Sequence, residues 1–160
     1  MKWVINNYHG DWEWILEYTK DYVLYDKKEK NVGSNIYDYM DFIVNNYDNL
    51  PEFTLFGKSN MLERHITEEE FDKLVDRREF TPLLTQNHKT YLPVCWYEDG
   101  MYCELNNMWF LNEYPLRDKS ILKLLDIEKR LYNKFAPGAS YIVPKENILK
   151  HSKGSVTSSL

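Results

Sequence analysis

The sequence predicts an α/β protein: a three-layer α/β/α sandwich around a Rossmann-like mixed sheet with a parallel N-terminal βαβαβ unit. Within residues 1–60, three strand-like runs alternate with two helix-like segments, and each run leads into a cluster of polar residues. The runs are 2–6, 22–25 and 53–56, and the clusters that follow them are 7–11, 26–28 and 57–60. Because parallel strands bring such clusters to one edge of the sheet, the carboxyl edge, the sequence also predicts where a ligand binds.

Capping residues and apolar spacing place the two helices between these strands. Asp11 is expected to cap a first helix over 11–20. Ser34 begins a second helix over 34–47, which Asn49-Leu50-Pro51 ends. The apolar residues of this second helix are spaced as on one helical face: Ile36, Met40, Ile43 and Tyr47.

A third helix has the clearest start in the chain. Thr67 and Glu70 form a capping box, in which each side chain accepts a hydrogen bond from the backbone N–H of the other residue. Ile66 and Phe71 stand where a hydrophobic staple closes around such a box. The helix is expected to end near Arg78.

A β-hairpin is predicted over 90–105, because Asp99-Gly100 is a turn signal between two strand-like runs. A two-residue turn there gives two opposed pairs, Glu98 with Met101 and Trp96 with Cys103. In that register Cys95 lies on the other side of the sheet from Cys103. We therefore expect free thiols, as in a reducing compartment.

The rest of the second half predicts a long helix, a strand and a short last helix. The long helix begins at Asp118, and its apolar face extends to Phe135. Residues 140–143 form a short strand, and Pro144 lies in the first turn of the last helix. The hairpin and the 140–143 strand are expected to extend the sheet, so that one domain covers 1–150. The remaining residues, 151–160, read as a flexible polar tail.

The composition narrows the class of protein. Asp and Glu total 25 against 20 Lys and Arg, which argues against a dedicated nucleic-acid binder. The N-terminus lacks the pattern of a secretory signal, and no stretch reaches the roughly 20 apolar residues of a membrane span. We therefore expect a cytoplasmic protein that has no membrane span and does not bind nucleic acid. The composition leaves the oligomeric state open.

Residues at the carboxyl edge suit a phosphorylated ligand. Backbone amides at the start of the second helix form a natural anion site around three residues: Asn31, Gly33 and Ser34. Asp26 would accept hydrogen bonds from a ribose or sugar hydroxyl, while Lys27 and Lys58 would neutralise a diphosphate. The alternative is that 26–30 is only a solvated charged turn.

Several known motifs are absent. Gly57-Lys58-Ser59 looks like the end of a phosphate-binding loop, but Glu52 stands where that loop needs its first glycine. The four histidines are scattered, and no Asp-x-Asp motif follows the third strand. The sequence also has no Gly-x-Ser-x-Gly element for a Ser/His/Asp triad. No cofactor is therefore predicted, although a divalent metal is left possible.

Several stretches resemble one family, the domain of unknown function 3431 found in fungal and bacterial proteins. They are Tyr8-His9-Gly10-Asp11-Trp12, Tyr25-Asp26-Lys27, Asn31-Val32-Gly33, 46–51, 53–56 and 135–145. The resemblance covers roughly residues 3–150 and implies a compact relative of GT-A glycosyltransferases. Such enzymes bind a nucleotide-sugar at the carboxyl edge and transfer the sugar to an acceptor hydroxyl. The chain departs from the family at Ser34-Asn35, where Arg-Glu is usual, and at Gly57-Lys58.

The resemblance implies roles for individual residues. Nucleotide contacts fall to Tyr8, Asp11, Asp26 and Lys27, and phosphate contacts fall to Gly33 and Ser34. Lys58, Arg64 or His65 would stabilise the leaving diphosphate in place of a metal. Glu63 would act as the base, and Asn60 is a further candidate for ligand binding. The alternatives are an inactive binding module of the same fold, or another α/β enzyme that handles nucleotides or phosphates.

Overall fold

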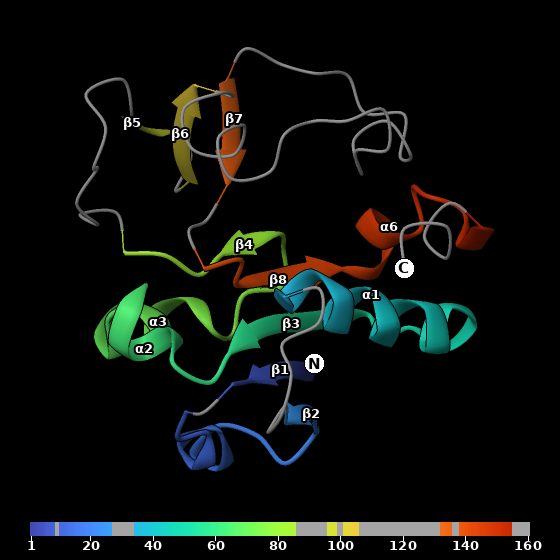
Figure 1. The fold of residues 1–160 in the computed structure, drawn as a ribbon, viewed down its shortest axis with the longest axis horizontal. Helices are drawn as coiled ribbons and strands as arrows, with labels where there is room; N and C mark the ends of the chain where they lie inside the picture. The colour runs from blue at the N-terminus through green and yellow to red at the C-terminus, as the bar shows by residue number, and fades with distance from the viewer. Residues whose placement is uncertain are drawn as a thin grey trace.

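The computed structural model describes seven stretches of the chain, which Figure 1 draws in colour. They are residues 1–8, 10–26, 34–85, 96–98, 101–105, 132–135 and 138–154.

A mixed sheet of five strands, in the order β2-β1-β3-β8-β4, forms the centre of the fold. The strands are β1 (Lys2–Asn7), β2 (Tyr22–Asp26), β3 (Phe53–Lys58), β4 (Thr81–Pro82) and β8 (Tyr141–Pro144). β1 pairs in parallel with both β2 and β3, whereas β8 runs antiparallel to β3 and to β4. The predicted mixed sheet with a parallel N-terminal unit is therefore confirmed.

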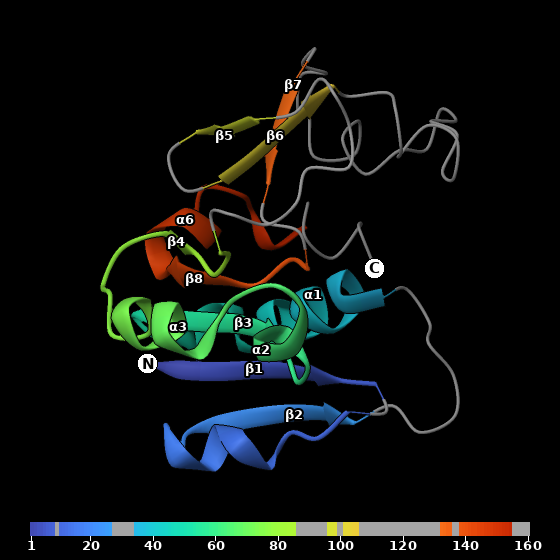
Figure 2. The same ribbon diagram turned by 90° about the vertical axis from the view of Figure 1, so that its left-hand side faces the viewer.

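Helices cover both faces of this sheet, as Figures 1 and 2 show. They are η1 (Glu13–Glu17, a 3-10 helix), α1 (Ser34–Asn46), η2 (Tyr47–Asn49, also 3-10), α2 (Met61–Arg64), α3 (Glu68–Leu74) and α6 (Lys145–Ile148). η1, α2 and α3 pack on one face, and α1 and α6 pack on the other. The three predicted layers are present.

The strand order explains why the helices divide between two faces. From β1 the chain crosses outward to β2, and from β2 it crosses back over β1 to reach β3. Parallel crossovers share one hand, so crossovers that proceed in opposite directions lie on opposite faces. η1 therefore belongs to one layer and α1 to the other, and the order of the chain reverses between β1 and β3.

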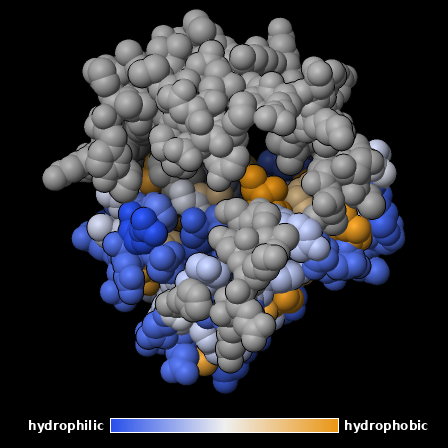
Figure 3. All heavy atoms as spheres, in the orientation of Figure 1, coloured by the Kyte–Doolittle hydropathy of each residue, from blue (hydrophilic) through white to orange (hydrophobic). Residues whose placement is uncertain are grey.

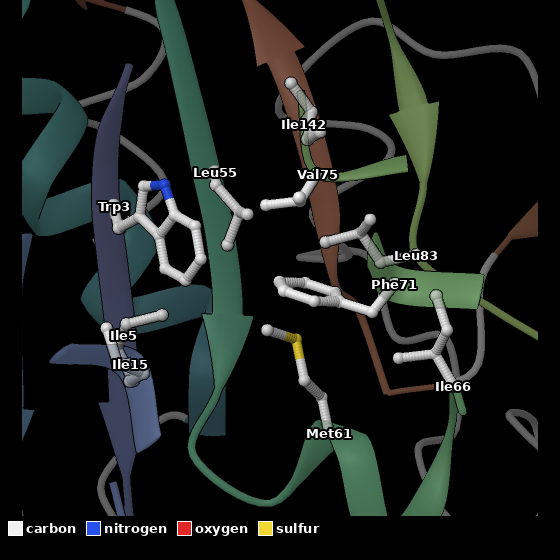
Figure 4. Packing of buried hydrophobic residues seen from close by; sticks show 10 residues of the cluster. All are labelled: Trp3, Ile5, Ile15, Leu55, Met61, Ile66, Phe71, Val75, Leu83 and Ile142. Carbon is white, nitrogen blue, oxygen red and sulfur yellow. The ribbon is translucent and has the colours of Figure 1, made fainter. Parts of the chain in front are cut away.

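The face under η1, α2 and α3 is an aromatic core, here called the aromatic face. Phe71 is fully buried at its centre, and its ring makes edge contacts with Trp3, Trp14 and Tyr18 at centroid distances of 5.1–5.8 Å. Figure 4 shows Phe71 among aliphatic and sulfur-containing side chains from β1, β3, α2 and β8. Half of the predicted capping box is present, because Thr67 Oγ1 accepts the Glu70 N–H at 3.3 Å. The other half is wrong: the Thr67 N–H donates to Thr85 Oγ1 at 2.9 Å and not to the Glu70 side chain.

The opposite face, here called the α1 face, buries a different set of residues from the one predicted. Ile36 was expected to point at the sheet, but its side chain is 49% exposed. Asp38, Tyr39 and Phe42 are buried instead. Ile43, also predicted, is only partly buried against this cluster. An aspartate interrupts the true buried stripe, so apolar spacing alone placed the stripe partly to one side of it.

Four other predictions are corrected. The first helix is a short 3-10 helix over 13–17, and α3 ends at Leu74 rather than near Arg78. Pro144 is the N-cap of α6 and does not lie inside its first turn. The hairpin does not extend the main sheet, because it pairs with β7 in a second sheet.

This second sheet has three strands in the order β5-β6-β7. The strands are β5 (Trp96–Glu98), β6 (Met101–Leu105) and β7 (Tyr132–Phe135). The predicted hairpin register is confirmed, with Trp96 opposite Cys103 and Glu98 opposite Met101. Residues 132–135, however, form a strand where the end of the long helix was predicted. The predicted helix over 118–131 and Cys95 lie outside the described residues.

In the part of the chain that the structure describes, no helix is both long enough and apolar enough to cross a bilayer. On the described part of the face in Figure 3, hydrophobic residues form small separate patches among hydrophilic ones.

Candidate functional site

The carboxyl ends of β1, β2 and β3 lie side by side, as the sequence predicted. In the register of the sheet, Asn7 is opposite Asp26, and Asn6 is opposite Lys58. The chain reverses its direction of winding between β1 and β3, and ligands of open α/β sheets bind at such a point. We call this region the carboxyl-edge site.

An amide links the ends of β1 and β2. Asn7 Nδ2 donates to Asp26 Oδ1 at 3.0 Å, and Asn7 Oδ1 accepts the backbone N–H of Gly10 at 3.1 Å. The exposed Asp26 carboxylate is thus oriented by a buried neighbour. Asn7 fixes both the last residue of β2 and the turn that follows β1.

The turns after β1 and β3 are held against each other. The Ser59 N–H donates to the Asn6 carbonyl at 3.0 Å, and Trp14 Nε1 donates to the Ser59 carbonyl at 2.7 Å. Gly10 lies directly beside Ser59, since a Cβ on Gly10 would come within 2.6 Å of Ser59 Oγ. A side chain at position 10 would require the Ser59 hydroxyl to move, so the turns after β1 and β3 are closely packed here.

Two cations near the end of β3, Lys58 and Arg64, lie close enough for their charges to interact. Lys58 is half-buried, and its pKa is lowered by burial and by the nearby positive charge of Arg64. Within the described residues neither side chain makes a hydrogen bond or an ion pair. Placing two like charges together while one is partly removed from water costs free energy. An anion between them would remove this cost.

A buried carboxylate that the sequence did not single out lies near the end of β1. Asp38 of α1 is 1% exposed, and it accepts a hydrogen bond from Asn6 Nδ2. Asn6 is itself buried and is the register partner of Lys58. Asn6-Asn7 at a strand end was a visible signal, but nothing in the apolar spacing of α1 indicates that Asp38 faces the sheet.

His65 closes the side of the site next to β8. Its imidazole packs on Gly138, where an added Cβ would lie 2.3 Å from the His65 Cδ2 atom. Gly138 has a φ of +91° and Ala139 a φ of 55°, so two consecutive residues adopt left-handed conformations. Asn35 of α1 donates to the Gly138 carbonyl at 3.5 Å. These contacts connect α1, α2 and the start of β8.

The remaining candidate residues near the carboxyl-edge site differ in exposure and in their hydrogen bonds. Tyr8 directly follows β1 and is 46% exposed. Asp11 is exposed, and its Oδ1 accepts the Glu13 N–H at 3.0 Å, so it shapes the start of η1. Asn60 is half-buried at the N-cap of α2. Glu63 is exposed on α2, and among the described residues no hydrogen bond or ion pair connects it to Lys58.

Four predicted residues cannot be placed in the site. Lys27, Asn31 and Gly33 lie outside the described residues, as does the side chain of Ser34. Their proposed contacts with phosphate stay predictions. No group of three or more His, Cys, Asp or Glu side chains suited to a metal occurs among the residues that are described.

A hollow of about 360 Å³ lies at the opposite, amino edge of the sheet. Met1, Trp3, Tyr18 and Val75 contribute apolar and aromatic surface, and the charged lining consists of Glu17, Asp76 and Arg78. Burial and the hydrogen bond to Asp72 raise the pKa of Tyr18 to about 12. Because Trp3 lies near the start of β1 and Asn7 ends it, the hollow is separate from the carboxyl-edge site.

Comparison of the chain with family models, with curated proteins and with solved structures finds no match in any of the three. The family resemblance stays a prediction made from the sequence.

Proposed function

We propose that the carboxyl-edge site binds the diphosphate of a nucleotide-sugar and that the protein transfers the sugar to an acceptor hydroxyl. The observation that carries the proposal is the pair of cations, Lys58 and Arg64, at the point where the winding of the sheet reverses. A diphosphate supplies two adjacent negative charges, which suit two adjacent cations. The resemblance to GT-A-like enzymes supplies the reaction class.

The neighbouring residues would serve the rest of such a ligand. Asp26, oriented by Asn7, would accept a hydrogen bond from a ribose or sugar hydroxyl. Tyr8 offers an exposed ring at the end of β1 for stacking on a base. In the transfer step, the acceptor oxygen forms a bond to the anomeric carbon while the bond from that carbon to the diphosphate breaks. The acceptor proton passes to a base, for which Glu63 is the candidate.

The decisive experiment measures the thermal midpoint against a panel of nucleotides and nucleotide-sugars, each with and without manganese. A ligand that binds only the folded state raises this midpoint. We expect one nucleoside diphosphate or its sugar to give a clear rise. No shift with any member at millimolar concentration would contradict the proposal.

Lys58→Met tests the role of this cation, because it should raise thermal stability while it weakens nucleotide binding. The lowered pKa means that protonated Lys58 is less favourable in the folded than in the unfolded protein at neutral pH. We therefore expect the ligand-free variant to melt higher than the wild type and to bind the nucleotide about tenfold or more weakly. Lys20→Met, at an exposed lysine, is the matched control and should change neither value.

The placement of the two catalytic candidates favours a second function. Glu63 is exposed, and His65 is packed against Gly138, so neither is held towards Lys58 by a described contact. This arrangement suits a binding module that keeps the site without the chemistry. Nucleotide binding without release of a nucleoside diphosphate, in the presence of varied glycan and small-molecule acceptors, would support this second function.

A further inference from the structure

The two edges of the five-stranded sheet differ sharply. β4 forms one edge, has only two residues, and one of them is Pro82. Short edge strands that contain proline are a common means of preventing unwanted strand pairing. β2 forms the other edge with five residues, Tyr22 to Asp26, and contains no proline, lysine or arginine. In the part of the chain that the structure describes, only the β4 edge has these protective features.

The sequence of β2 suits a strand that is covered on both faces. Tyr22, Val23, Leu24 and Tyr25 form a continuous apolar run, a pattern typical of interior strands whose two faces are both covered. In the structure all four are only half-buried, and among the described residues β2 pairs with β1 alone. β2 lies at the margin of the sheet in both ribbon views (Figures 1 and 2).

The register fixes which backbone groups point outward. Trp3 donates its N–H to the Asp21 carbonyl at 3.0 Å. Along a parallel strand the hydrogen-bonding groups alternate between the two sides, residue by residue. Val23 and Tyr25 therefore bond to β1, while the N–H and C=O groups of Tyr22, Leu24 and Asp26 point away from the sheet.

We propose that β2 pairs with β2 of a second copy of this chain, antiparallel, about a two-fold axis at Leu24. Two copies of one strand related by a two-fold axis normal to the sheet must run antiparallel. With the axis at Leu24, each residue whose backbone groups point outward lies opposite another such residue in the second copy. Leu24 lies opposite Leu24, and Tyr22 lies opposite Asp26. The result is one continuous sheet across two chains.

Side-chain chemistry supports this register and this partner. Asp26 carries the only charge in β2, and the two-fold axis places the two Asp26 residues at opposite ends of the pairing. Each Asp26 comes opposite Tyr22, whose phenol is a hydrogen-bond donor for a carboxylate. Val23 comes opposite Tyr25, a β-branched residue against an aromatic one, which is a favourable cross-strand pair. The proposal does not depend on the proposed function.

Two variants that place opposite charges at position 24 provide the test. The measured quantity is the molar mass of the protein in solution. We expect the wild type to be dimeric at micromolar concentration. Leu24→Lys and Leu24→Glu should each be monomeric, because like charges would stand directly opposite each other. An equimolar mixture of the two variants should restore a dimer. Leu149→Lys and Leu149→Glu, at an exposed leucine after α6, should leave the wild-type dimer intact.

A wild-type monomer at high concentration would overturn the proposal, and so would a dimer that persists in both Leu24 variants. Amide hydrogen exchange of the wild type gives an answer even if the Leu24 variants do not fold. The amides of Leu24 and Asp26 point away from β1, so we expect their protection to rise with protein concentration. Unprotected exchange of these amides at every concentration would equally overturn it.

Discussion

The two faces of the sheet are stabilised in different ways. The aromatic face is closed by interlocking rings around Phe71, and its largest buried side chains are apolar. The α1 face buries the carboxylate of Asp38 together with the hydroxyl groups of Tyr39 and Thr54. Within the described residues, neither of these two hydroxyl groups makes a hydrogen bond. The α1 face therefore carries buried polar groups that cost stability, whereas the aromatic face is stabilised by apolar packing.

The largest difference between the faces should appear when one ring is removed from each. Phe71→Ala removes a fully buried ring that contacts three others, and should cost about 3–5 kcal/mol of unfolding free energy. Phe42→Ala on the α1 face removes a ring that contacts Phe56 at 6.1 Å. We expect the smaller loss there, measured by urea unfolding. Equal losses would show that the two faces do not differ in packing.

Asp38→Ala tests the polar link on the α1 face. The substitution leaves the buried amide of Asn6 without its acceptor and should cost about 1–3 kcal/mol. Asn6→Ala and the double variant complete a cycle whose coupling energy isolates the hydrogen bond. Asp48→Ala, at an exposed ion pair with Lys153, is the control and should cost well under about 1 kcal/mol. An Asp38→Ala variant as stable as the wild type would refute the link.

Thr67→Ala tests the helix cap on the aromatic face. Thr67 Oγ1 accepts the Glu70 N–H, so the alanine variant should lose about 1 kcal/mol. Serine keeps the acceptor, and Thr67→Ser should retain most of the stability. A loss of the same size in both variants would assign the effect to the missing methyl group and not to the cap.

The smallest effect expected is a gain. Thr54 is fully buried in β3, and no described residue makes a hydrogen bond with its hydroxyl group, so Thr54→Val should stabilise the protein by about 1 kcal/mol. Thr81 is the matched control, because its buried Oγ1 donates to the Glu79 carbonyl at 3.1 Å. Thr81→Val should therefore destabilise. If both variants shifted the thermal midpoint in the same direction from that of the wild type, this interpretation of the α1 face would be contradicted.

The parts of the fold that local rules govern were predictable. The side-chain cap from Thr67 to the Glu70 N–H needs only neighbours within four residues, and the hairpin register at Asp99-Gly100 needs only the turn type. The parallel arrangement of β1, β2 and β3 followed from short crossovers of one hand. The predictions failed where a remote partner decides: β7 pairs with β6 across a long stretch of chain, and residues 132–135 carry no local sign of it.

The candidate site was predictable only in part. Asp26 and Lys58 follow strand ends, and the rule for parallel sheets brought them to one edge. The closeness of Arg64 to Lys58 and the contact between His65 and Gly138 depend on how α2 and β8 pack, which no spacing in the sequence reveals. Asp38 was missed because a carboxylate is normally assigned to the solvent side of a helix.

By itself, the sequence determined the class of fold, the edge at which its polar residues gather, and the helix and turn signals that act over a few residues. The tertiary structure alone decided which residues of α1 are buried against the sheet, which cations interact and which strands form the two edges of the sheet. The physical reason is that periodicity and capping are short-range effects of the backbone. Burial of a charge, by contrast, is permitted only by a specific partner such as Asn6, which is remote in sequence.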